Sequence, residues 1–421
     1  MRRVSFIFWQ EHGLNTLLYA VVVQGAGAFF CAAVSFGLTL GLGRVLGVSG
    51  FGQYVATLNL ATLALIVMEF GWPRRVYKES AVSGWQTQDL LTHAARHILL
   101  ATLLGMVWAW HFQADVALCA AMACMGAVAL MNLASDHMRG AGRFALEALW
   151  QSAGRVVSAL AIGLAVWQLG LATPTAVFTA WGVGLCIVLL CGRHWLAAPW
   201  RRTTESTLAN YRQVLPFVLL AGGVAWLVKG DMVLLSRLPN VEPNDLSMYA
   251  ACTRLTEMGL LVFAPLNNVL LREFGQSPTT NGMPKLAFKL LAGIALLGVL
   301  AVYAASVLGS PLMGLLFGSE FTTAGSLLPW VLFALPFAAA NGVMIQLLTA
   351  QGHEGAVASI MLLAGLALWA GLTWSVPQWG LTAAAVSVAM AQFFALICAL
   401  IFCFWRARYP RATWQSTTKW S

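Results

Sequence analysis

The chain has 421 residues, of which 60% are hydrophobic and 9% are charged, and its formal net charge is +9 at pH 7. Its mean hydropathy of +0.77 is too high for a soluble domain. The basic excess does not indicate binding to DNA or RNA, because aromatic and basic residues do not alternate outside the predicted loops. These values indicate an integral membrane protein.

Twelve apolar runs follow one another along the chain. Each is about 20 residues long, which is enough for a helix to cross the hydrocarbon core of a bilayer. They cover residues 17–42, 51–71, 92–111, 115–135, 148–170, 172–192, 213–237, 247–271, 286–308, 326–349, 355–375 and 380–404. The connections are short and leave no room for an extramembrane domain. We therefore predict an all-α polytopic membrane protein with about twelve transmembrane helices.

Lysine and arginine are distributed unevenly between the two sides of the predicted membrane. Nineteen of the 24 lie at the chain ends or in even-numbered connections, whereas the odd-numbered connections hold only Arg44 and Arg237. By the positive-inside rule, this asymmetry places both termini in the cytoplasm, and the even number of spans agrees.

Cysteines and histidines give little sign of chemistry. All eight cysteines fall inside predicted spans without a CxxC pair, so we expect buried small hydrophobic residues rather than disulfides or metal ligands. His93 and His97 stand one helical turn apart, which suits a metal, but the glutamate of a zinc-protease motif is absent. An interfacial basic cluster is the better interpretation. We expect no cofactor and no enzymatic activity, because no nucleophile and base are paired.

The second half of the chain repeats features of the first. Residues 52–56 (GQYVA) enter the second span much as residues 247–251 (SMYAA) enter the eighth. At this offset of 195 residues, Asn59 corresponds to Arg254. Six spans followed by six related spans in the same orientation predict two six-helix bundles related by an axis along the membrane normal. Transporters of this kind bind their substrate between the bundles near the midplane.

These repeats predict the domain boundaries. We expect an N-terminal bundle at residues 1–195, a cytoplasmic linker at 196–212, a C-terminal bundle at 213–405 and a cytoplasmic tail at 406–421. The second bundle carries charged residues where the first carries neutral polar ones.

Four ionisable residues lie inside the seventh and eighth spans, namely Lys229, Asp231, Arg254 and Glu257. A charge near a bilayer centre costs about 2.5–3.5 kcal/mol on translocon scales, so such residues normally face a cavity or one another. Both helices place them about two turns below the same membrane face. A mostly polar stripe continues along the eighth span through Asn268, which indicates a wet cavity rather than lipid contact.

Several short motifs run nearly from end to end of the chain, at residues 42–47, 50–54, 69–75, 229–235, 249–255, 315–321 and 377–384. In this order they resemble motifs of the polysaccharide-unit flippases, the Wzx-type branch of the MOP transporter superfamily. Two departures occur. Thr382 replaces the usual glycine before paired alanines, and His353 with Glu354 replaces a basic pair after the tenth span.

This resemblance implies a MATE-like fold and a flippase in the bacterial inner membrane. Its substrate would be an oligosaccharide repeat unit on a polyprenyl diphosphate, used for O-antigen or exopolysaccharide assembly. The implied partners are membrane lipid, a polysaccharide polymerase, a chain-length protein and a coupling proton or sodium ion.

The substrate so implied is anionic and heavily hydroxylated, so its path needs cations and hydrogen-bonding groups. Arg254 and Lys229 could supply charge, with Asp231 holding Arg254, and Glu257 nearby. Asn59, Asn268 and Gln24 could contact sugars. Each has a structural alternative, since Asp231 and Arg254 could form an interhelical salt bridge, and amides often join membrane helices.

Two other functions stay open. A multidrug or small-cation exporter of the related branch is favoured by an acid-dominated cavity, and the basic groups count against it. A non-transporting scaffold for glycan assembly is disfavoured by the intramembrane charges and the polar stripe. A gene position among glycosyltransferase genes would favour the flippase.

Overall fold

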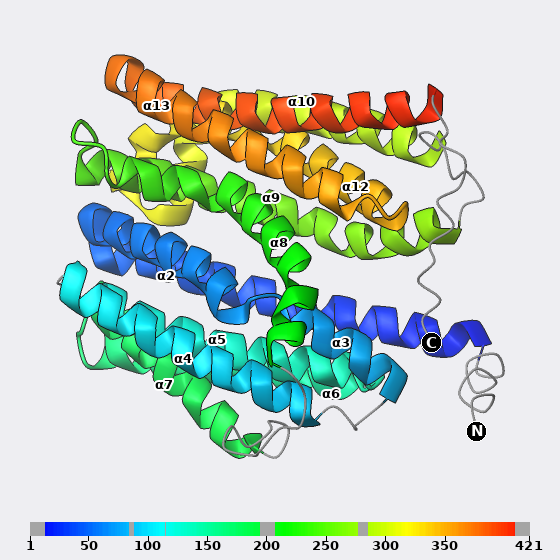
Figure 1. The fold of residues 1–421 in the computed structure, drawn as a ribbon. Coiled ribbons are helices and arrows are strands. Elements are labelled where there is room, and N and C mark those ends of the chain that lie inside the picture. The colour runs from blue at the N-terminus through cyan, green and yellow to red at the C-terminus, as the bar shows by residue number, and fades with distance from the viewer. Residues whose placement is uncertain (1–12, 84–87, 114, 194–206, 277–284, 409–421) are drawn as a thin grey trace. The chain divides into compact units, whose positions relative to one another are not determined.

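The computed structural model describes residues 13–83, 88–113, 115–193, 207–276 and 285–408. All regular structure in these ranges is helical (Figure 1). The elements are α2 (Gly13–Glu69), α3 (Trp72–Ser83), α4 (Gln88–Phe112), α5 (Val116–Gly140), α6 (Phe144–Gly163), η1 (Leu164–Gln168), α7 (Pro174–Cys191), α8 (Thr207–Leu235), α9 (Pro243–Gln276), α10 (Lys285–Phe317), η3 (Ser319–Ser326), α11 (Leu328–Leu332), α12 (Leu335–Ala350) and α13 (Glu354–Arg408).

Nine helices in the described ranges are long and apolar enough to cross a membrane. Two of them, α2 and α13, each hold two of the predicted spans. The eighth predicted span lies in α9, which the polar stripe makes less apolar than its neighbours. Together these helices account for the twelve predicted spans, and the prediction of an all-α polytopic membrane protein is confirmed.

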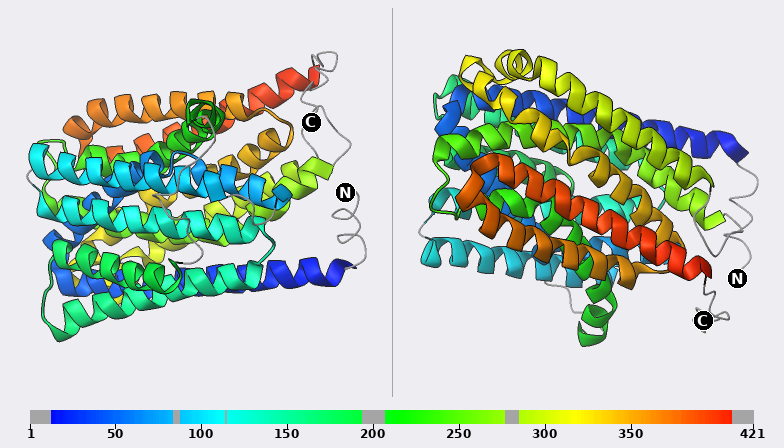
Figure 2. Two further views of the ribbon diagram at one scale, coloured as in Figure 1. Left: turned by 60° about the horizontal axis from the view of Figure 1, so that its bottom comes forward. Right: turned by 90° about the horizontal axis from the view of Figure 1, so that it is seen from above.

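Single glycines break the two longest helices. Gly47 in α2 has φ 66° and Gly380 in α13 has φ 67°, a left-handed conformation that glycine adopts without steric cost. The chain of α13 reverses direction at Gly380. The reversal follows from the contact between the two sides of the break, since a Cβ on Gly371, before it, would lie only 3.4 Å from Ser387, after it. In a straight helix these residues would be about 24 Å apart. The two arms of α13 lie side by side, as Figures 1 and 2 show in orange and red.

The described chain forms two compact units. The first comprises Met1–Gly50 and Ala61–Val218, and the second comprises Phe51–Leu60 and Leu219–Ser421. Both α2 and α8 therefore contribute to each unit. Most of the predicted linker at 196–212 lies outside the described residues, so the predicted domain boundaries stay predictions.

Small residues allow close helix packing in the first unit, where α5 contacts α3, α4, α6 and α7. A Cβ on Gly126 of α5 would lie only 2.9 Å from Thr102 Cβ of α4. A Cβ on Gly184 of α7 would lie 2.6 Å from Ser158 Cα of α6. Membrane helices associate through such small residues, because lipid supplies no hydrophobic drive between them.

Aromatic rings fix the short α2 segment that belongs to the second unit. Phe51 is fully buried, with its ring centroid 5.8 Å from that of Phe317 in α10 and 6.0 Å from that of Phe321 in η3. In the same unit α9 packs on α12, and α12 packs on α13. The α2 segment is thus held against α10 and η3 of the second unit.

The orientation in the membrane is open to a direct test. We expect reporter fusions at Pro243 and at Ser421 to report opposite sides, with Ser421 cytoplasmic, because nineteen basic residues to two favour that side. His353 lies in the short connection after α12. Burial, and to a smaller extent the positive charge of Arg406, lowers the pKa of His353, so this connection adds no positive charge at neutral pH. Fusions that report the same side would contradict the twelve-span topology.

Candidate functional site

The charged residues of the second unit meet because α8 and α9 form a helical hairpin. A hydrogen-bonded turn joins Leu235, the last residue of α8, to Pro243, the first residue of α9. The two helices therefore run antiparallel beside each other. Lys229 stands six residues before the end of α8 and Glu257 fourteen residues after the start of α9, so their long side chains reach along the hairpin to meet.

Glu257 is shared by two cations. Its Oε1 accepts a hydrogen bond from Lys229 Nζ, and its Oε2 accepts one from Arg254 Nη1 at 2.6 Å. The three side chains are largely buried, with exposed fractions of 18% for Lys229, 22% for Glu257 and 9% for Arg254. One carboxylate thus faces two positive charges, and the three residues together carry a formal charge of +1.

One edge of the Arg254 guanidinium group, the open edge, is buried but lacks hydrogen-bond partners in the described part of the chain. Among the residues that the structure describes, its Nε and Nη2 have no hydrogen-bond partner, although both atoms are buried. These two N–H groups lie on the same edge of the planar head, while Nη1 is used by Glu257. An edge of this kind binds a phosphate or carboxylate through two parallel hydrogen bonds.

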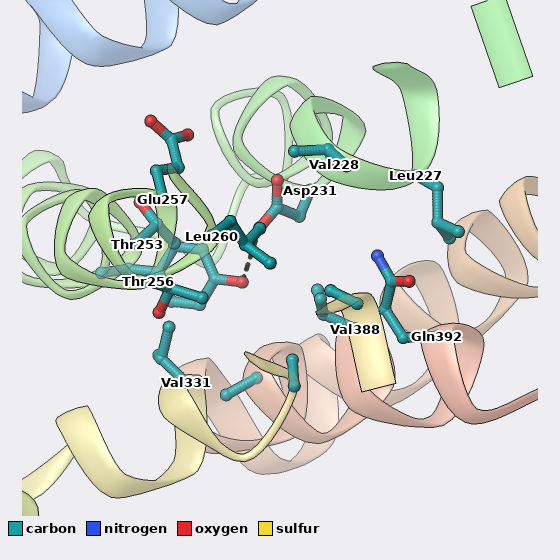
Figure 3. A pocket seen from close by; sticks show the side chains of 14 residues that line it. Leu227, Val228, Asp231, Thr253, Thr256, Glu257, Leu260, Val331, Val388 and Gln392 are labelled. Carbon is teal, nitrogen blue, oxygen red and sulfur yellow. Dashed lines mark hydrogen bonds between the residues drawn. The ribbon is translucent and has the colours of Figure 1, made fainter. Parts of the chain in front are cut away.

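Asp231 does not hold Arg254, and the predicted contact between them is wrong for this conformation. Its Oδ2 accepts a hydrogen bond from the Tyr249 hydroxyl at 2.7 Å, and its Oδ1 accepts one from the backbone N–H of Met232 at 2.8 Å. Figure 3 marks the Asp231 side-chain bond with a dashed line. Asp231 therefore ties α8 to α9, and the carboxylate that pairs with Arg254 is that of Glu257.

A small cavity adjoins this cluster within the second unit. Its volume is about 50 Å³. Figure 3 shows Asp231, Thr253, Thr256 and Gln392 around it. Asn341 Nδ2 fixes Gln392 by donating to its side-chain oxygen at 2.8 Å. A space of this size holds water rather than a glycan, since ligand pockets measure roughly 300–1,000 Å³.

Asn59 and Asn268 differ in how far the structure places them. Asn59, in the α2 segment of the second unit, is 1% exposed, and its Oδ1 has no hydrogen-bond partner in the described ranges. Asn268 lies in α9, but its side chain is outside the described residues. The same holds for most side chains of the polar stripe in the C-terminal half of α9.

Gln24 belongs to a network inside the first unit. Its Nε2 donates to Glu147 Oε2 at 3.2 Å, and Ser135 donates to Glu147 Oε1 at 2.6 Å. Arg139 lies 3.6 Å from the same carboxylate and 2.6 Å from Asp136. Gln24 therefore joins α2 to α6, which favours the structural interpretation of this residue.

Sequence reasoning missed Glu147 and its partners on α5. The signal was present as a stripe on α5, where Asn132, Ser135, Asp136 and Arg139 recur at three- and four-residue steps. Asn132 also donates to Glu69 Oε1 at 2.7 Å. The acceptor Glu147 stands on α6, across a turn, and nothing in the local pattern indicates that pairing.

Both ring nitrogens of His97 are engaged. Nδ1 lies 2.8 Å from the Tyr211 hydroxyl, and Nε2 lies 2.9 Å from the backbone oxygen of Val67. His97 is thus a structural contact between α2, α4 and the start of α8. No group of three or more His, Cys, Asp or Glu side chains in the described ranges could hold a metal ion.

Comparisons with known proteins identify the fold but no close relative. No protein-family model matches the chain, and no curated protein matches it. An inward-facing multidrug resistance MATE family transporter of the MOP superfamily matches with TM-score 0.70 and 12% identity, over 92% of this chain and 98% of that one. Lipid II flippase MurJ in an inward closed conformation matches with TM-score 0.66 and 13% identity, over 90% and 87%.

A third structure, an outward-facing MATE transporter of the MOP superfamily, matches with TM-score 0.58 and 14% identity, over 94% of this chain and 96% of that one. Identities this low establish the fold alone. The chain is therefore a multi-pass membrane protein with the MATE-like fold of MOP superfamily transporters.

Proposed function

We propose that this protein is a flippase that moves a polyprenyl-diphosphate-linked oligosaccharide repeat unit across the bacterial inner membrane for surface polysaccharide assembly. The fold is compatible with it, since a lipid II flippase and multidrug transporters have similar folds. The residues of the second unit, rather than the fold, favour the flippase among these activities.

The observation that carries the proposal is the open edge of Arg254. A buried donor left without a partner costs about 1–3 kcal/mol, and more when the group is charged. A phosphate oxygen pair placed on Nε and Nη2 would recover that cost. A diphosphate is the anionic part of the proposed substrate.

The same cluster counts against a small-cation exporter. Such a protein needs acidic groups free to face the ligand. Here Glu257 is occupied by Lys229 and Arg254, and Asp231 is occupied by Tyr249 and a backbone N–H. Among Lys229, Asp231, Arg254 and Glu257, the buried side-chain atoms without a partner in the described ranges are the Nε and Nη2 donors of Arg254.

Deleting the gene is expected to stop export of one surface polysaccharide and to let its lipid-linked repeat unit accumulate on the cytoplasmic side. The repeat unit accumulates because its charged, hydroxylated head group does not cross the hydrocarbon core without a transporter. Surface glycan can be measured on gels, and the lipid-linked unit by mass spectrometry of extracted lipids. A plasmid copy of the gene should restore both.

Other outcomes of this experiment would select other functions. If the repeat unit were never made, an enzymatic or scaffold role would replace the flippase. If surface glycans were normal and drug sensitivity rose, the protein would be an exporter.

A further inference from the structure

In the second unit, the α2 segment at Phe51–Leu60 touches the N-terminal end of α9. A Cβ on Gly52 of α2 would overlap Ser247 Oγ of α9 and would lie 3.1 Å from the backbone oxygen of Pro243. Phe51, beside it, is clamped by Phe317 and Phe321. The α2 segment therefore lies directly against the first turns of α9, and glycine permits this approach.

The register of this contact places Asn59 and Arg254 on facing sides. Each stands seven residues after the contact, Asn59 after Gly52 and Arg254 after Ser247. Seven residues return a helix to nearly the same face, about 10.5 Å further along its axis. Because the second and eighth spans are predicted to run in the same direction through the membrane, we infer that both side chains lie at one level.

Both residues hold buried polar atoms that lack partners, and the atoms are complementary in kind. Arg254 is 8% exposed and offers two donors, Nε and Nη2. Asn59 is 1% exposed and offers one acceptor, Oδ1. A ligand that satisfies both must carry an anionic oxygen pair and, next to it, an O–H or N–H donor.

We propose that Arg254 and Asn59 form one recognition site for a glycosyl phosphate. Arg254 binds the phosphate oxygens, and Asn59 accepts a hydrogen bond from a hydroxyl or amide N–H of the first sugar. Asn59 thereby distinguishes a carrier lipid that bears a sugar from one that does not. This inference rests on the proposed function. It adds that the protein recognises the first sugar of the substrate as well as its phosphate.

A purely structural role for Asn59 predicts a different effect of its substitution on ligand binding. If Asn59 only joined helices through a bound water, its loss would alter stability without changing preference between ligands. The ratio of two affinities separates these possibilities, because misfolding lowers both affinities together.

The test uses the full chain in lipid nanodiscs with two probes, polyprenyl diphosphate and polyprenyl diphosphate-N-acetylglucosamine. Native mass spectrometry gives both affinities. Asn59→Ala is expected to weaken the sugar-bearing probe about tenfold, as for one hydrogen bond, and to leave polyprenyl diphosphate within about twofold. Arg254→Ala should weaken both probes. Asn341→Ala is the matched control, since Asn341 is also a buried asparagine with an unpartnered Oδ1, and it should change neither.

A second variant keeps the inference testable if Asn59→Ala folds poorly. Asn59→Leu keeps nearly the shape of asparagine but has no acceptor, so it should weaken the sugar-bearing probe about tenfold and leave polyprenyl diphosphate within about twofold. The inference is overturned if Asn59→Ala leaves the ratio at the wild-type value. If the wild-type protein bound neither probe, the proposed function itself would fail.

Discussion

Replacing Arg254 with alanine is expected to abolish polysaccharide export while the protein stays at its normal abundance in the membrane. Removing one partner of a buried ion pair normally costs about 3–5 kcal/mol, because the other charge is left uncompensated. Here Glu257 keeps its hydrogen bond to Lys229, so Arg254→Ala leaves no bare carboxylate. The loss should therefore fall on substrate binding rather than on folding.

Glu257→Gln is the contrasting variant. It leaves Lys229 and Arg254 close together without a shared counter-charge, so we expect low abundance in addition to lost export. Arg254→Lys keeps the charge but removes the planar edge that binds two oxygens, and it should retain only part of the activity. Surface glycan and membrane abundance are measured in parallel for all three variants.

Two results would change the assignment. Full export by Arg254→Ala at normal abundance would remove Arg254 from the substrate path. Low abundance of Arg254→Ala with export normal per molecule would make the residue a structural one.

The spans and the meeting of three buried charges could be predicted from the sequence, because hydropathy and helical spacing determine them. The choice of partners was predicted wrongly at Asp231. Lys229 and Asp231 both reach α9, but Asp231 meets Tyr249, which stands eight residues, or about 12 Å, before Glu257. The α9 residue that each of them meets depends on the register of the α8–α9 hairpin, which no local pattern in the sequence gives.

Other parts of the site depend on contacts that no local pattern carries. The match of Asn59 with Arg254 in the internal repeat was visible in the sequence. Their placement at one level required the contact between Gly52 and Ser247. Glu147 escaped notice for the same reason, since its partners Gln24 and Ser135 come from two other helices.

The second large effect is expected at Gly325 of η3, where even alanine should destabilise the protein. A Cβ there would overlap the backbone of Gly309 and Ser310 in α10, and backbone cannot move aside as a side chain can. Overpacking typically costs about 1–3 kcal/mol, and a clash with backbone belongs at or above the upper end. Because η3 carries Phe321, which packs on Phe51, a shift of η3 would also disturb the α2 segment that holds Asn59.

Gly293→Ala is the matched control on α10, because a Cβ at Gly293 meets no atom within 4 Å. Alanine is the better helix former by about 1 kcal/mol, so Gly293→Ala should leave stability unchanged or slightly raised. The check is the temperature at which each detergent-solubilised variant loses its monodisperse peak on size-exclusion chromatography. Gly325→Ala should lose it well below the wild type, and Gly293→Ala should not. Equal temperatures for the two variants would mean that η3 and α10 do not pack backbone to backbone in the membrane.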